Sequence, residues 1–129
     1  MLLLALAQAS ANLPAPPAAE AWSALPFVPV NMLTIDDAAT IMRLGARHSE
    51  CRASIRPMAD GMERLDLDLV LLIAPDGRLL QTVAATGPCD AIRQQAQALV
   101  SARYPSGARR PAGPAPTWYR THLGISWSQ

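Results

Sequence analysis

The chain has 129 residues, a length that fits one domain and excludes a multidomain enzyme. Eleven arginines oppose ten acidic residues and no lysine occurs, so the formal net charge is +1. This balance argues against a nucleic-acid partner, which needs clustered cations. No stretch of the sequence reaches the ~20 apolar residues that cross a bilayer, so we expect no stable membrane insertion of the mature chain.

The first residues have features of a secretory signal. In the signal-like segment 1–11, the apolar run Leu2–Ala7 precedes two small-x-small triplets, as at signal cleavage sites. The run is short and no Lys or Arg precedes it. Three interpretations therefore stay open: an exported protein, a cytosolic protein with an apolar terminus, or a longer signal whose start codon lies upstream.

The two cysteines bear on the same question of compartment. Cys51 and Cys89 are 38 positions apart (89 − 51), and an even cysteine count in a small exported protein predicts a disulfide. We predict that these two residues form it. The alternative is a pair of buried, reduced thiols in a cytosolic protein.

Residues 12–33 contain five of the twelve prolines and are predicted to form an extended or polyproline-like arm or linker. Its apolar side chains could dock on the rest of the protein, or the arm could be disordered. The candidates for docking are Trp22, Leu25, Phe27 and Val28. Residues 34–129 are predicted to be a single domain.

Two amphipathic helices are predicted. Thr34 is a suitable N-cap for a helix over Asp36–His48, because acidic residues follow it and apolar residues recur at helical spacing. A second helix over Cys89–Tyr104 begins after Pro88, a residue that the first helical turn tolerates well. It should end before Pro105.

A β-hairpin is the clearest pattern in the chain. Polar and apolar residues alternate from Glu63 to Ala74, which indicates a strand with one buried face. At Val70 and Leu72 the second face also becomes apolar, so this half should be covered on both sides. The turn Ala74–Gly77 then leads to an antiparallel return strand over Arg78–Ala85.

Residues 51–56 could form a further short strand, and residues 117–127 alternate again as a final strand. The fold class is therefore α+β, with a small antiparallel sheet of three to four strands packed against one or two helices. One face of the final strand carries the candidate residues for binding a partner at a sheet edge. They are Tyr119, Thr121, Leu123, Ile125 and Trp127.

Several motifs occur in a recognisable order. They are Ala74–Arg78 at the hairpin turn, Thr86–Gly87 before the helix, Arg103–Pro105 after it and Ile125–Trp127 in the last strand. This order resembles the C-terminal domain of TonB-type energy transducers of Gram-negative bacteria. The resemblance covers residues 51–129, and it implies the same α+β fold.

The chain departs from that family because its amino-terminal part is at most signal-like and its proline-bearing arm is short. The resemblance therefore implies a stand-alone relative rather than an energy transducer. It predicts a non-enzymatic periplasmic module that binds an envelope protein or peptide by strand addition at a sheet edge. A homodimer through the same edge is possible. A small cytosolic structural or regulatory subunit is the alternative.

Catalytic chemistry has little support in the sequence. His48 and Cys51 could pair a base with a thiol, but a helix-end histidine beside a structural cysteine is the simpler interpretation. We predict no catalytic residues, no metal site and no cofactor, since the spacings typical of zinc sites and phosphate loops do not occur. Asp66 and Asp68 are assigned to the solvated face of a strand, and His122 likewise.

Overall fold

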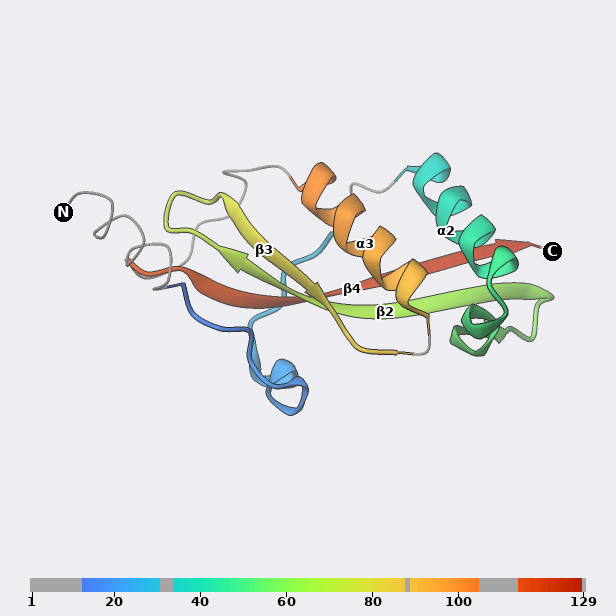
Figure 1. Cartoon of the computed structure of the whole chain (residues 1–129), viewed down its shortest axis with the longest axis horizontal. Coiled ribbons are helices and arrows are strands. Elements are labelled where there is room, and N and C mark those ends of the chain that lie inside the picture. The colour runs from blue at the N-terminus through green and yellow to red at the C-terminus, as the bar shows by residue number, and fades with distance from the viewer. Residues whose placement is uncertain (1–12, 31–33, 88, 105–113, 129) are drawn as a thin grey trace.

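The computed structural model describes residues 13–30, 34–87, 89–104 and 114–128, and the signal-like segment 1–11 lies outside these ranges. The fold is α+β, as predicted: two α-helices cover one face of a four-stranded antiparallel sheet (Figure 1). In chain order the elements are the 3-10 helix η1 (Ala19–Ala24), α2 (Ile35–Arg47), the 3-10 helix η2 (Ser49–Ser54), β1 (Ile55–Pro57), β2 (Met62–Ile73), β3 (Leu79–Ala84), α3 (Asp90–Arg103) and β4 (Thr117–Ser128).

The long strand β2 is the centre of the sheet. It pairs with β4 over its whole length, from Met62 opposite Ser128 to Ile73 opposite Thr117, in an unbroken antiparallel register. On its other side β2 pairs first with β1 and then with β3. Because β1 and β3 share that side, β4 alone forms the opposite edge of the sheet.

The hairpin between β2 and β3 forms as the sequence predicts. Gly77 adopts a φ of 90°, a left-handed conformation that favours glycine, and its N–H donates to the Ala74 carbonyl at 2.8 Å. Arg78 donates both its backbone N–H and its guanidinium Nε to the Asp76 carboxylate. These bonds, first that from the backbone N–H, hold the pKa of Asp76 below its usual value.

Helix α2 begins at the predicted cap. The Thr34 hydroxyl accepts the Asp37 N–H at 3.1 Å, and the Asp37 carboxylate accepts the Thr34 N–H at the same distance. The same carboxylate is buried and bound by the Arg103 guanidinium from the last turn of α3. Asp37 therefore joins the two helices, a role that its position in a first helical turn did not reveal.

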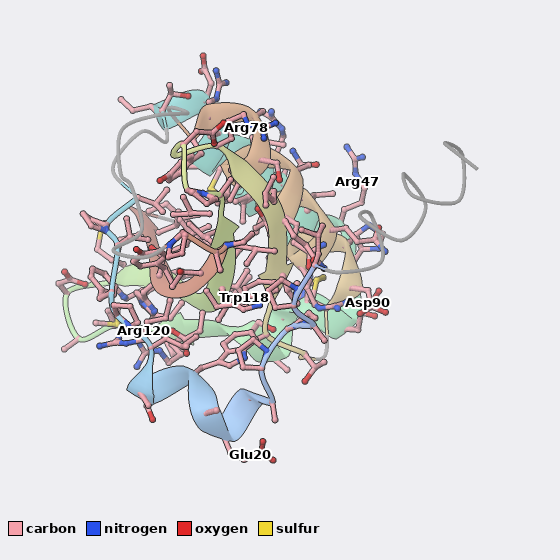
Figure 2. The ribbon with its side chains drawn as sticks, turned by 90° about the vertical axis from the view of Figure 1, so that its left-hand side faces the viewer. Glu20, Arg47, Arg78, Asp90, Trp118 and Arg120 are labelled. Atoms are coloured by element: carbon pink, nitrogen blue, oxygen red, sulfur yellow. A yellow bond between two sulfur atoms is a disulfide. The ribbon has the colours of Figure 1, made fainter. Side chains whose placement is uncertain are left out.

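The arm is docked, and its predicted conformation is partly wrong. Residues 19–24 lie between Pro17 and Pro26 and contain no proline, so they are free to form the 3-10 helix η1 instead of an extended segment. On the sheet face opposite the helices, Trp22 and Leu25 pack against Val70, Leu72 and Trp118. Figure 2 shows Trp118 between the sheet and the arm. The apolar second face predicted for this half of β2 is therefore covered.

The predicted strand over residues 51–56 is also corrected. Residues 49–54 form η2, and only Ile55–Pro57 pair with β2. A 3-10 turn directs Cys51 into the core, where it is fully buried and forms a disulfide with Cys89 at a Cα–Cα distance of 4.6 Å. The predicted disulfide is thus present, and it ties η2 to the start of α3. Within the described residues, no helix is long and apolar enough to cross a membrane.

Candidate functional site

The outer edge of β4 is partly occupied by the arm. Phe27 forms a parallel bridge with Arg120: the Val28 N–H donates to the Arg120 carbonyl, and the Arg120 N–H donates to the Pro26 carbonyl, both at 2.9 Å. The Arg120 guanidinium also donates to the Leu25 carbonyl and lies over the Phe27 ring. The edge of β4 therefore already accepts an extended segment of this chain at one position.

Beyond that bridge, the edge of β4 offers open backbone groups. In an antiparallel strand, the N–H and C=O groups of every second residue point to the same side. Because the register with β2 has no bulge, the backbone groups of His122, Gly124 and Ser126 point outward like those of Arg120. Among the residues that the structure describes, none bonds to these three residues from the outer side through its backbone.

On the opposite side of the sheet, α3 covers the outer edge of β3 at Ala84. The Ala84 N–H in β3 donates to the Gln97 side-chain oxygen at 2.8 Å, and the Ala84 carbonyl accepts from Arg93 Nε at 3.3 Å. Natural sheets commonly cover their edges in this way to prevent unwanted pairing. At Ala84 the outward backbone groups of β3 are therefore already bonded, unlike those of His122, Gly124 and Ser126 among the described residues.

The predicted edge residues lie on β4, but they face inward. Their side chains point to the helix-covered face, and their backbone groups pair with β2. Trp127 is half-buried, and the other four are buried, namely Tyr119, Thr121, Leu123 and Ile125. The groups that β4 can offer to a partner's backbone belong to the alternate residues, which the sequence analysis did not assign to the site.

A hollow of about 340 Å³ lies beside this open part of the edge. Residues 122–126 form one wall, and Val30, Thr34 and the first turns of α2 form the other. From α2, Ile35 and Ala38 line it, and Ile35 is 89% exposed. Ile35 therefore offers one exposed apolar side chain at the rim of the hollow, beside the outward backbone groups of β4.

His122 lies between two carboxylates on the helix-free face of the sheet. Its Nδ1 is 2.8 Å from Asp68 Oδ1, and its Nε2 is 2.8 Å from Asp66 Oδ1. Both ring nitrogens can donate only in the imidazolium form. The pKa of His122 is raised above 6.5, chiefly by the hydrogen bond to Asp68. Partial burial lowers the pKa, and the hydrogen bond to Asp66 raises it further.

Two arginines complete this polar cluster. Burial alone would raise the pKa of Asp66, but hydrogen bonds from His122, Arg56 and Arg64 outweigh it and lower that pKa. Arg64 crosses over Gly124, where a Cβ would lie 2.3 Å from its Nη2, and reaches the Ser126 hydroxyl at 3.3 Å. Charged groups therefore flank the open edge on this face, within reach of the side chains of an added strand.

The cluster around His122 has a signal in the sequence, but it requires the strand register. Once β2 and β4 are paired antiparallel, Asp68 stands opposite His122 and Asp66 opposite Gly124. From the sequence alone, Asp66, Asp68 and His122 are assigned to solvated strand faces and are not paired with one another. Residues directly opposite on one face interact, and here they do so as charged partners.

The alternative thiol chemistry has no free thiol to use. Cys51 is bonded to Cys89, and His48 pairs instead with Glu50, at 3.6 Å between Nδ1 and Oε1. No group of three or more His, Cys, Asp or Glu residues in the described part of the chain could hold a metal ion. The arrangement offers hydrogen bonds and charge rather than a nucleophile beside a base.

Comparisons with known proteins find no matching family model, no matching curated protein and no matching solved structure.

Proposed function

We propose that the protein is a non-enzymatic binding module that takes up an extended peptide as an additional strand on the edge of β4. The observation that carries this proposal is the outward row of backbone groups at His122, Gly124 and Ser126, next to a hollow of mixed polar and apolar lining. Main-chain hydrogen bonds supply affinity in strand addition, and flanking pockets supply specificity. Each such bond contributes about 0.5–1.5 kcal/mol.

The arm supports the geometry of this binding mode. Its bridge at Phe27 runs parallel to β4, and it shows that a chain fits against the outer edge without disturbing the ladder to β2. A peptide paired with residues 122–126 would continue along the same edge. Its side chains would alternate between the hollow beside α2, where Ile35 and Ala38 offer apolar contacts, and the charged cluster around His122.

The proposed partner is an envelope protein or peptide met in the periplasm. The signal-like residues 1–11, the disulfide between Cys51 and Cys89 and the resemblance to TonB C-terminal domains support this proposal. A stand-alone relative of that family would use strand pairing without energy transduction. A second copy of the chain, paired through the same edge, is the other partner that this geometry fits.

A matched pair of variants at Ser126 tests strand addition. Ser126→Pro removes both the outward N–H and the side-chain hydroxyl. Ser126→Ala removes only the hydroxyl and keeps the N–H. Proline is tolerated on an edge strand where its nitrogen faces solvent, so both variants should fold, as near-UV circular dichroism would verify. The probe is a display library of random linear dodecapeptides selected on the wild-type protein.

We expect the enriched peptides to bind the wild type and Ser126→Ala alike, and to bind Ser126→Pro about two- to twelvefold more weakly, the loss of about one main-chain hydrogen bond. Equal binding to the folded proline variant would refute pairing at this edge. Failure of the library to yield any wild-type binder would count against the proposal as well. A concentration-dependent dimer that only Ser126→Pro abolishes would assign the edge to a second copy.

The compartment is tested by the intact mass of the protein from a fractionated Gram-negative host, measured with and without alkylation under denaturing conditions. Export predicts the loss of about 9–11 residues and two cysteines that resist alkylation. A full-length mass with two alkylated thiols would contradict export. It would favour the cytosolic subunit and leave the edge of β4 as a site for a cytosolic partner.

A further inference from the structure

A second hollow, of about 640 Å³, lies between the C-terminal half of α2 and the end of the sheet where β1, β2 and β4 meet. Figure 1 shows α2 above this end of the sheet. Its volume is in the range of small-molecule sites, ~300–1,000 Å³. Most of its lining is apolar and comes from α2, β1 and β4, namely Met42, Gly45, Ala46, Ile55, Pro57 and Trp127.

Packing at two points shapes this cleft. Gly45 brings the backbone of α2 close to β1, because a Cβ at that position would lie only 2.8 Å from Ile55 Cδ1. At the end of β4, Trp127 is held by a hydrogen bond from its indole N–H to Glu63 Oε2 at 3.0 Å. The indole donor is therefore already used, and the ring presents apolar surface to the cleft.

The cleft also has an excess of positive charge. Arg43 from α2 and Arg52 from η2 both line it, and neither forms an ion pair with a described carboxylate. The guanidinium of Arg43 contacts only the Thr40 hydroxyl, at 3.4 Å, among the bonds seen in the described ranges. Glu63 lines the cleft too, and its carboxylate, which accepts the Trp127 indole N–H, offsets one of the two positive charges and leaves a net charge of one.

We propose that this cleft binds an apolar carboxylate, an unbranched acyl chain whose carboxylate contacts Arg43 and Arg52. The apolar lining would bury the hydrocarbon, and the two guanidinium groups would supply charge-assisted hydrogen bonds. A peptide fits less well, because its backbone amides would enter an apolar lining whose indole N–H is already engaged. This site is separate from the edge of β4 and does not depend on strand addition.

Three ligands test separately whether the cleft recognises the hydrocarbon chain and whether it recognises the carboxylate. Decanoate, octanoate and decyltrimethylammonium are titrated below their micellar concentrations into the full chain by calorimetry. Shortening the acid by two methylenes should weaken binding roughly tenfold. The cation of equal chain length should bind at least tenfold more weakly than decanoate. Equal binding of the cation and the acid would overturn the role of the arginines.

Variants locate the binding within the cleft. We expect Arg43→Gln with Arg52→Gln to weaken decanoate binding by more than tenfold, and Ala46→Trp to abolish it by filling the cleft from an exposed position. Arg47→Gln is the matched control: Arg47, labelled in Figure 2, lies on the same helix outside the lining. An equal loss in Arg47→Gln would indicate a general surface charge effect and refute the site.

Two further results would also overturn the proposal. One is the absence of any decanoate binding to the wild-type protein. The other is tighter binding of an acetylated tripeptide ending in a leucine carboxylate, which would assign the cleft to a peptide terminus. Binding of decanoate unchanged by Ser126→Pro, in contrast, would show that the cleft acts independently of the proposed peptide edge. Failure of one site would therefore leave the other standing.

Discussion

Reduction of the disulfide is the perturbation whose magnitude follows most directly from the structure. Cys51 and Cys89 are 38 positions apart and both lie buried in the core with Ile41, Leu65 and Ile92. In the chain-entropy model, closing a loop of that size in the unfolded chain stabilises the fold by about 4 kcal/mol at 25 °C. A small domain has a net stability of about 5–15 kcal/mol, so the crosslink carries a large share of it.

The assay is urea unfolding followed by tryptophan fluorescence, with and without a phosphine reductant. With an m-value of about 1–3 kcal/mol/M, reduction should lower the unfolding midpoint by about 1.3–4 M. Reduction removes no heavy atom from the two buried side chains, so the change in stability reports the crosslink rather than a lost core contact. The double variant Cys51→Ala with Cys89→Ala is the control, because reductant should not shift its midpoint. A shift below about 0.5 M in the wild type would refute the loop-closure reasoning.

Three other predictions follow from named contacts. Thr34→Ala removes the hydroxyl of the capping box and should lower the free energy of unfolding by about 1 kcal/mol, measured by urea denaturation; an unchanged midpoint would refute the cap. His122 has a raised pKa in the folded state, so its stabilising effect is complete below its unfolded pKa near 6.5 and is lost as pH rises through the folded pKa. The stability of the wild type should therefore fall over that pH window, and the stability of His122→Gln should not. Parallel urea denaturation series of the two proteins across the window would measure the difference. Trp22→Ala should loosen the arm from Val70 and Leu72 and lower the free energy of unfolding by about 1–2 kcal/mol, since the side chain is half-buried. It should also accelerate proteolysis within residues 13–30. Unchanged cleavage would contradict docking through this residue.

The arm has two structural roles that the open edge depends on. It covers the apolar part of the helix-free face, and it occupies the edge of β4 at Arg120. Among the described residues, the outward backbone groups that lack a backbone partner begin directly after that bridge, at His122. The arm therefore bounds the proposed peptide site at Arg120 and, through Val30, along one wall of the hollow. Its loss would lengthen the edge available to a partner or to a second copy of the chain.

Local sequence determined the elements whose signals lie within a few residues. The alternation of β2, the turn at Ala74–Gly77 and the cap at Thr34 all formed as predicted, because backbone sterics and short-range hydrogen bonds decide them. The cysteine count and spacing also led to the correct disulfide. The boundaries of α2, α3, β2, β3 and β4 agreed to within a residue or two for the same local reasons, whereas β1 and the two 3-10 helices did not follow the prediction.

Tertiary structure alone decided the features on which function would depend. Which backbone groups of β4 stay open follows from its register with β2, and that register also places His122 between Asp66 and Asp68. The burial of Asp37 depends on the distant Arg103, and the docking of η1 depends on an apolar sheet face formed by three separate segments. Such contacts join residues that are far apart in the chain. Local propensity cannot specify them, because the free energy that selects them comes from packing and pairing in the folded state.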